Sequence, residues 1–296
     1  MIVRDLIITN ASGESLVFGD HLKLYEDIEL SGLKADVSMA EISGDGASAQ
    51  KTRLDTRDFE IPFLLHRIVD DKVWFEDKRQ DIFRVCNPKK NPIRLDFKTD
   101  AEQEYYMHAE LTAVPVMPRG FENSNHVWQK VLLQFDAADP YIYAKDETLV
   151  ELAMWVPAFE FPLEIPEGEG IEMGYRNPTL ITNVINDGQE DSGMIIKFKA
   201  NAGLTNPSLV NLDTYEQLTL KMAMLAGDEV EISTYRGNKY ARLIRNNVTT
   251  SVFGKIDYLS TFLQLRTGDN VFRYNADTGI DNLEISMRFS KKFVGV

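Results

Sequence analysis

The chain has 296 residues, of which 44% are hydrophobic and 26% are charged, and its formal net charge is −14. This composition is typical of a globular protein, and the length suits one large or two ordinary domains. An acidic surface repels phosphate backbones and anionic lipids, which argues against sequence-specific binding of nucleic acid. A passive conduit for DNA stays compatible with this charge.

The sequence contains no run of about eighteen apolar residues, so we expect no membrane insertion. Its opening residues lack the basic start and apolar core of a signal peptide. The single cysteine, Cys86, excludes an internal disulfide framework and multi-cysteine metal sites. We therefore expect synthesis in a reducing cytoplasm.

The first half is predicted to be an antiparallel sheet, because apolar and polar residues alternate in segments joined by short turns. The predicted strands are Asp5–Asn10, Ser15–Phe18, Tyr25–Leu30, Gly32–Met39, Asp58–Leu65, Ile93–Phe97, Tyr105–Val114 and Val127–Phe135. One stretch, Ile42–Gln50, has no large apolar residue after Ile42, so it cannot anchor itself in a core. We expect a loop, or an arm that becomes ordered on a neighbouring molecule.

One helix is predicted between Trp74 and Cys86, ending before Asn87-Pro88. Phe75, Ile82, Phe83 and Cys86 fall on one helical face, and charged residues fall on the opposite face. The helix packs on the sheet in this reading. Cys86 is a candidate nucleophile in form, but its place on the apolar face favours a buried structural thiol.

A domain boundary is predicted where the strand ending near Phe135 meets Asp139-Pro140, since proline cannot continue a ladder. The expected domains are residues 1–144, which would make a ring, and residues 145–296, an acidic connector plus a sandwich. The connector, Lys145–Gly174, has one base against eight acids, so it is interpreted as a solvated segment. Its prolines and alternating Phe159, Phe161 and Leu163 suggest that it orients the second domain.

The second domain is predicted to be a β-sandwich, because turn motifs recur every ten to fifteen residues between alternating runs. The clearest runs are Met194–Ala200, Gln217–Met224, Glu229–Tyr235 and Leu283–Phe289. A helical period is suggested only around Ser260–Leu263. The fold class is therefore mainly β, with one helix in the first domain.

No catalytic, cofactor-binding or metal-binding residues are predicted, and no cofactor is expected. The four histidines, His21, His66, His108 and His126, lie in the first half at spacings that match no metal motif. Gly44-Asp-Gly46 is neither a dinucleotide fingerprint nor a phosphate-binding loop. The carboxylates of Glu164–Glu172 lie in the acidic connector, where a solvated segment is favoured over a glycosidase pair.

Turn and strand landmarks spread over nearly the whole chain. In the first half they are Thr9-Asn10 followed by Gly13-Glu-Ser, Gly32-Leu33, Asp45-Gly46, Arg57, Asn87-Pro88, and Phe135 before Asp139-Pro140-Tyr141. In the second half they are Asn186-Asp-Gly188, Gly203 with Asn206-Pro207 and Asn211, Gly227-Asp before Ile232-Ser-Thr234, and Leu265 with Gly268 and Asn270 before Tyr274. In order and spacing they resemble the distal tail proteins of phages with long, non-contractile tails.

This resemblance implies a structural protein rather than an enzyme. It implies a homo-hexameric ring, single or stacked, that joins the tail tube to the tail tip or baseplate at the distal end of the virion. The implied partners are further copies of the chain, the major tail tube protein, a tail-tip protein and receptor-binding or baseplate proteins, with DNA passing through the lumen. The implied second domain is a galectin-like β-sandwich.

Sugar-binding galectins hold a galactoside with histidine, asparagine, arginine and a stacking tryptophan. The second half has no histidine, and its one tryptophan is Trp155 in the connector. A protein-docking platform is therefore favoured over sugar recognition. Two alternatives stay open: a carbohydrate-binding module that uses Tyr235, Tyr240 and Tyr258 as platforms, and an enzyme that degrades cell-wall polymer.

Overall fold

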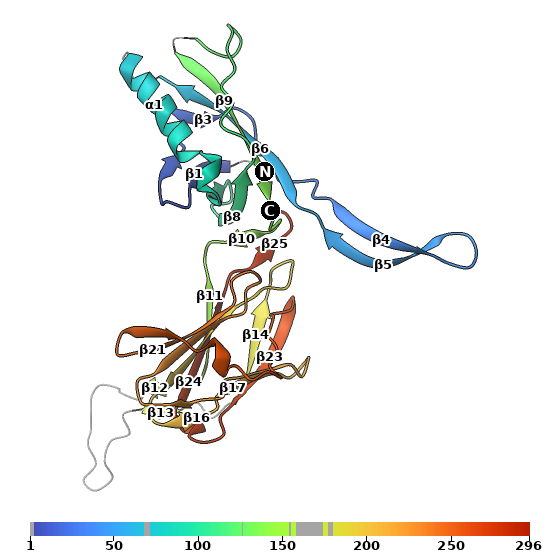
Figure 1. Cartoon of the computed structure of the whole chain (residues 1–296), viewed down its shortest axis with the longest axis vertical. Coiled ribbons are helices and arrows are strands. Elements are labelled where there is room, and N and C mark those ends of the chain that lie inside the picture. Colours follow the sequence, from blue (N-terminus) through green and yellow to red (C-terminus); the bar gives the residue numbers. More distant parts are fainter. Residues whose placement is uncertain (1–2, 68–71, 126, 154, 158–173, 177–179) are drawn as a thin grey trace. The chain divides into compact units, whose positions relative to one another are not determined.

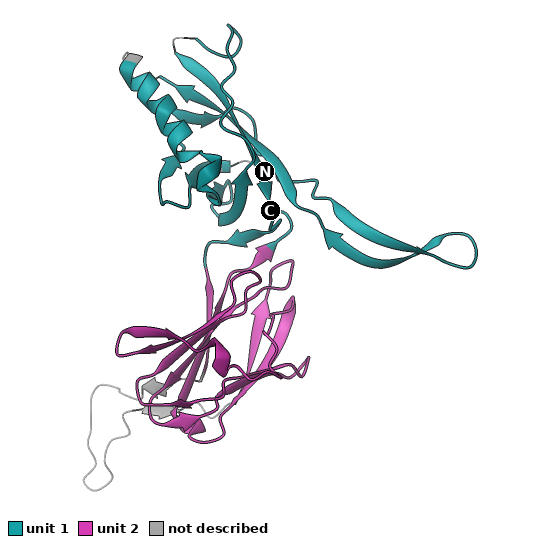
Figure 2. Ribbon diagram, viewed as in Figure 1, with its two compact units in different colours: residues 1–146, 293–296 teal, residues 147–292 magenta. Residues whose placement is uncertain are grey.

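The computed structural model describes residues 3–67, 72–125, 127–153, 155–157, 174–176 and 180–296. The chain divides into two compact units, residues 1–146 with 293–296 and residues 147–292 (Figure 2). The last four residues therefore belong to the first unit. No helix within the described ranges is long and apolar enough to cross a membrane.

The first unit is built on one mixed-length antiparallel sheet with the strand order β2-β1-β7-β8-β9-β6-β3 (Figure 1). These strands are β1 (Val3–Thr9), β2 (Ser15–Val17), β3 (Leu22–Leu24), β6 (Arg57–His66), β7 (Ile93–Thr99), β8 (Glu104–Leu111) and β9 (Trp128–Ala137). A short strand, β10 (Ile142–Ala144), pairs with β8 and with β25 (Lys292–Phe293). A separate two-stranded sheet is formed by β4 (Ala35–Glu41) and β5 (Ala47–Leu54).

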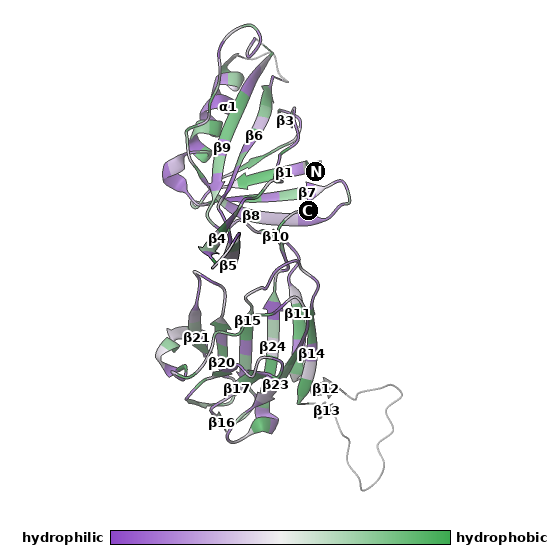
Figure 3. Cartoon of the chain, turned by 90° about the vertical axis from the view of Figure 1, so that its right-hand side faces the viewer, coloured by the Kyte–Doolittle hydropathy of each residue, from purple (hydrophilic) through white to green (hydrophobic). Residues whose placement is uncertain are grey.

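The core of this unit follows directly from the alternation of apolar residues. In β9 every second residue is buried. In β6, which pairs with β9, the alternate residues Phe59, Ile61, Phe63 and Leu65 are buried. Phe59 and Phe135, paired in register, stack with ring centroids 5.2 Å apart. The same alternation colours the strands of the sheet in Figure 3. The β-sheet prediction for the first half is confirmed.

The predicted helix is α1 (Lys72–Val85), followed by the 3-10 turn η1 (Pro88–Lys90). The Asn87 side chain accepts a hydrogen bond from the Lys89 amide and so caps η1. Ile82, Val85 and Cys86 are buried in the core, whereas Phe83 is only half-buried. The helix prediction is confirmed, with Val85 in place of Phe83 on the most buried face.

The predicted strand Tyr25–Leu30 is wrong. Ile28 and Leu30 are buried, as their alternation requires, but the segment joins no sheet. The carbonyl of Leu30 accepts a hydrogen bond from the guanidinium of Arg57 instead of from a neighbouring strand. The backbone is thus satisfied by a side chain that the local pattern does not indicate.

The second unit is a β-sandwich of two larger sheets with two small additions, as expected from the sequence. The six-stranded sheet has the order β11 (Thr148–Ala153), β24 (Leu283–Phe289), β15 (Ile195–Ala200), β20 (Glu229–Ser233), β21 (Tyr240–Arg245) and β22 (Val248–Ser251). The four-stranded sheet has the order β14 (Ile181–Asn186), β23 (Gly268–Asn275), β17 (Ser208–Asn211) and β18 (Gln217–Thr219). The short pairs are β16 (Leu204–Thr205) with β19 (Ala223–Met224), and β12 (Trp155–Pro157) with β13 (Gly174–Arg176); η2 (Phe253–Lys255) and η3 (Ile280–Asn282) are 3-10 turns.

Turn residues of the second unit are fixed by buried asparagines. Asn186 is buried, and its amide donates to the carbonyls of Glu190 and Leu265 at 3.1 and 3.3 Å. A Cβ added at Gly188 would lie 2.9 Å from the Lys292 carbonyl oxygen, so the Asn-Asp-Gly turn needs glycine for close approach. These contacts give the landmark motif a packing role.

Three expectations for the second half need correction. Gln217–Met224 forms two short strands, β18 and β19, rather than one. The residues around Ser260–Leu263 form no helix; Leu263 is buried from an irregular segment. Part of the predicted connector, Thr148–Ala153, is the strand β11, which pairs with β24. Its alternating Val150 and Leu152 pack in or against the core, and Phe159, Phe161 and Leu163 lie outside the described residues.

Candidate assembly interface

The most exposed element of the first unit is the hairpin of β4 and β5, called here the arm (residues 35–54). Figure 1 shows it extending away from the sheet of that unit. Every residue from Ala35 to Arg53 is exposed except Ala40, which is half-buried. The tip turns at Gly44 and Gly46, which both have positive φ. Isolated two-stranded hairpins are marginally stable in water, so the arm is built to rest on something else.

The two faces of the arm differ in chemistry. On one face Val37 pairs with Thr52 and Met39 pairs with Ala49, and Met39 is 63% exposed. On the other face Asp36 pairs with Arg53, and Ser38 pairs with Lys51. The predicted coreless stretch Ile42–Gln50 is thus the outer half of a longer amphipathic hairpin. Val37 and Met39 are the exposed large apolar residues of this face, at 38% and 63%, and they make it the candidate face for contact with another protein.

The root of the arm is held by Arg57, the first residue of β6 and 3% exposed. Its Nε donates to the Pro140 carbonyl at 2.8 Å, one terminal nitrogen donates to the Val294 carbonyl at 2.6 Å, and the other donates to the Leu30 carbonyl. Burial lowers the pKa of this guanidinium. Arg57 was one landmark of the resemblance, but the sequence assigned it no contact.

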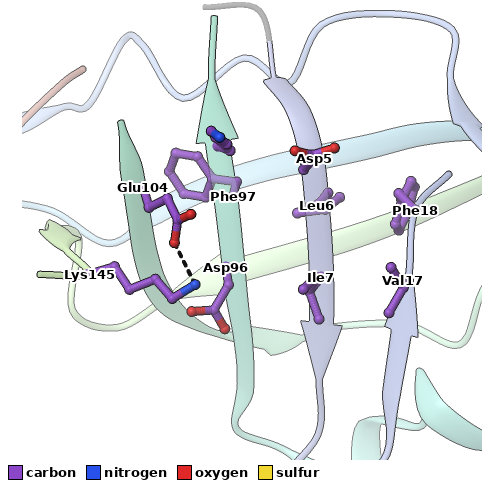
Figure 4. Close-up of a pocket in the computed structure, with 10 residues that line it drawn as sticks. Asp5, Leu6, Ile7, Val17, Phe18, Asp96, Phe97, Glu104 and Lys145 are labelled. Atoms are coloured by element: carbon purple, nitrogen blue, oxygen red, sulfur yellow. Dashed lines mark hydrogen bonds and ion pairs between the residues drawn. The ribbon is translucent and has the colours of Figure 1, made fainter. Parts of the chain in front are cut away.

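The ends of the described sheet in the first unit are short. The outermost strands, β2 and β3, have three residues each. A cavity of about 250 Å³ lies along β1 beside β2, with walls that include Ile7, Val17 and Phe97. Figure 4 shows Lys145 reaching Glu104 across its rim, at 2.6 Å. Apolar walls beside a strand edge suit a peptide segment more than a small reacting molecule.

Cys86 is fully buried, and burial raises the pKa of its thiol to about 12. A thiol with this pKa is protonated at neutral pH and is a poor nucleophile. This agrees with the structural role favoured for Cys86 from the sequence.

Of the described histidines, His21 and His66 are neighbours, since the His66 amide donates to the His21 carbonyl at 2.7 Å. His21 packs edge-on against Trp74, with ring centroids 5.5 Å apart. His108 lies beside Tyr106, and burial together with the charge of Arg94 lowers its pKa. His126 falls outside the described residues. Among the residues that the structure describes, no group of three or more His, Cys, Asp or Glu side chains could hold a metal ion.

The three tyrosines considered as sugar platforms have different surroundings. Tyr240 is half-buried, and its hydroxyl donates to Glu231 at 2.6 Å. The hydroxyl of half-buried Tyr235 accepts from the Ser290 amide at 3.1 Å. Tyr258 is 87% exposed. Two of the three are therefore engaged in packing the sandwich, and the carboxylates of Glu164–Glu172 lie outside the described residues.

The fold and the arm define a mainly β protein, in which the first unit presents an exposed hairpin and the second unit is a β-sandwich. Residues 187–293 match the family model described as siphovirus-type tail component, C-terminal domain. No curated protein matches the chain.

Two solved structures are similar over nearly the whole length. The crystal structure of SPP1 Dit (gp 19.1), described as a paradigm of hub adsorption apparatus in phages that infect Gram-positive hosts, is 12% identical, with a TM-score of 0.68, and covers 98% of this chain and 100% of its own. A chain of the phage P2 baseplate in its activated conformation with Ca is 13% identical, with a TM-score of 0.59 and 100% coverage of both chains. The resemblance to distal tail proteins read from the sequence is confirmed, and the shared fold is mainly β.

Proposed function

We propose that the chain is a structural phage-tail protein that forms a homo-hexameric ring, single or stacked, joining the tail tube to the tail tip or baseplate. The observation that carries this proposal is the arm, a hairpin whose apolar face has no support from its own unit among the described residues. The likeness of the fold to a hub protein and a baseplate protein supports it.

In this proposal the arm of each copy lies on the first unit of the next copy. The apolar face buries Val37 and Met39, and the exposed edges of the sheet are covered by the neighbour, so that six copies close a ring. A closed ring of identical contacts needs no reactive site, which is why the chain acts as an assembly protein and not as an enzyme.

The second unit serves as the docking platform for tail-tip, receptor-binding or baseplate proteins. The assembled ring lies in the virion at the distal end of the tail, and the chain is made in the cytoplasm of the bacterial host. Further partners are the major tail tube protein and a tail-associated protein, and DNA passes through the lumen without sequence-specific contact.

Native mass measurement of the whole chain tests this function. We expect six copies for the unchanged protein. Met39→Glu places a charge on the apolar face and should release single copies, whereas Ser38→Glu, the adjacent residue on the polar face, should leave the hexamer intact. A stable monomer of the unchanged chain would contradict the proposal. Selective binding to cell-wall glycans on an array would favour the carbohydrate-binding alternative.

A further inference from the structure

Arg57 joins three segments that are far apart in the sequence. Its three carbonyl acceptors belong to Leu30, Pro140 and Val294, which are 27, 83 and 237 positions away. All three acceptors are neutral carbonyls, so among the described residues the hydrogen bonds of this buried cation go to backbone dipoles. A guanidinium has five N–H donors in a fixed fork, so it can hold several carbonyls in one geometry.

Arg57 and one of its acceptors, Leu30, flank the arm in the sequence. Leu30 precedes β4, and Arg57 follows β5, so that the contact between them closes the root of the hairpin. Just above it, the amide of Asp55 donates to the Lys34 carbonyl at 2.9 Å. Beyond this point the arm is exposed. The direction in which the arm leaves the first unit is therefore set at its root.

The third acceptor brings in the segment Phe293–Val296. This segment belongs to the first unit, where the Phe293 ring packs edge-on against Tyr105 with centroids 5.6 Å apart. Gly295 and Val296 line a cavity of about 340 Å³ together with the loop at Asp27–Ser31, and Arg57 donates to one carbonyl in each of these two segments.

We propose that Arg57 is the positioning residue of the arm, and that it holds the arm in the direction needed for assembly only when the 294 carbonyl is in place. This inference rests on the proposed ring. If any one acceptor is absent, a buried cationic donor is left unsatisfied, which is costly enough to open the root.

The test compares Arg57→Met, which keeps much of the apolar stem, with the unchanged whole chain. Native mass should show single copies of Arg57→Met at concentrations where the unchanged chain is hexameric. Hydrogen exchange of the Asp55 amide should become about tenfold faster or more, because a charged buried hydrogen bond is lost. Amides of β9 should keep their protection, which shows that the sheet is folded. Arg57→Lys keeps the charge but lacks the forked guanidinium, so its Asp55 amide should exchange at a rate between those of Arg57→Met and the unchanged chain.

Arg242→Met is the matched control, because Arg242 is an exposed arginine of the second unit that lies over the Tyr240 ring. It should change neither mass nor Asp55 exchange. Hexamers of Arg57→Met with unchanged exchange at Asp55 would overturn the proposal. If the unchanged chain is monomeric, the ring fails, but the exchange comparison still decides whether Arg57 holds the root. If β9 protection is also lost in Arg57→Met, the partial opening expected of Arg57→Lys becomes decisive, and its absence overturns the proposal.

Discussion

Glu14 lies at the centre of a charge cluster that joins the turn between β1 and β2 to the end of α1. Its carboxylate accepts hydrogen bonds from Lys90, from Asn10 at 2.9 Å and from Arg84 at 2.5 Å. These contacts, with the Lys90 hydrogen bond first, lower the pKa of Glu14 to about 2. A carboxylate with a lowered pKa stabilises the folded state above its ordinary pKa of 4.5.

Glu14→Gln should therefore lower the thermal midpoint at pH 7, and the loss should shrink as the pH falls from 4.5 towards 2, where Glu14 of the unchanged chain becomes protonated. Calorimetry at pH 7 and pH 3 measures this difference. Glu122→Gln, at an exposed loop position, serves as the control. An equal deficit at both pH values would remove the electrostatic explanation.

The buried thiol of Cys86 gives a second residue-level prediction. With a pKa of about 12, it should resist a thiol reagent at pH 8 in the folded chain and react fully after denaturation. Mass spectrometry of the alkylated chain counts the adducts. Fast labelling of the native protein would show that Cys86 is reachable and would reopen its reading as a nucleophile.

Arg57 shows why part of the interface could not be predicted from the sequence. A single arginine between Thr56 and Asp58 breaks no pattern, and its partners are backbone carbonyls, which every residue carries. By contrast, the burial of Cys86 was predictable, because its neighbours on the helix repeat every three or four residues. Burial on a helix face can be predicted from the spacing of apolar residues. Hydrogen bonds from a side chain to distant backbone carbonyls cannot, because no residue type marks the acceptor.

At the scale of elements, the alternation of apolar and polar residues predicted most strands of the first sheet. It did not predict which segment pairs with which neighbouring strand. Tyr25–Leu30 has the same period as a strand, yet the Leu30 carbonyl accepts its hydrogen bond from the Arg57 side chain. The segment at β11 was missed for the opposite reason. Its acids suggested a solvated connector, although an edge strand needs only one apolar face.

The edge strand β11 gives an element-level prediction with an internal control. Leu152 is 3% exposed in the core of the second unit, whereas Leu149 on the same strand is 61% exposed. Leu152→Ala should lower the free energy of unfolding of that unit by about 2–4 kcal/mol. Leu149→Ala should stay within about 0.5 kcal/mol of the unchanged chain. Urea unfolding of both variants, monitored by hydrogen exchange of the β15 amides, measures the two free energies. Equal effects would contradict the burial of β11 in the core.

At the scale of the whole molecule, the net charge of −14 bears on the DNA-conducting lumen of the proposed ring. Six such chains should not retain duplex DNA at physiological salt, because phosphate binding depends on cationic contacts that release counterions. A filter-binding titration at two salt concentrations measures this. Tight binding by the unchanged ring would contradict a passive conduit.

The division into units also decides how the ring should be tested in pieces. Residues 1–144 are expected to oligomerise and residues 145–296 are not, yet the segment Phe293–Val296 belongs to the first unit. A piece ending at 144 lacks the Val294 acceptor of Arg57. We expect it to assemble more weakly than a first unit that has residues 293–296 joined back by a short linker, and gel filtration of both pieces checks this. Equal assembly would show that the segment is dispensable.

The separation of 237 residues between Arg57 and Val294 has a consequence in time. At a synthesis rate of about 5–20 residues per second, roughly 12–50 s pass between the appearance of the two residues. During that interval strands β1 to β10 of the first unit can pair, but β25 is missing and Arg57 lacks one of its three acceptors. In unfinished chains on one messenger RNA, the direction of the arm would then not yet be fixed. We therefore expect assembly of neighbouring chains to be delayed until residue 294 has been added.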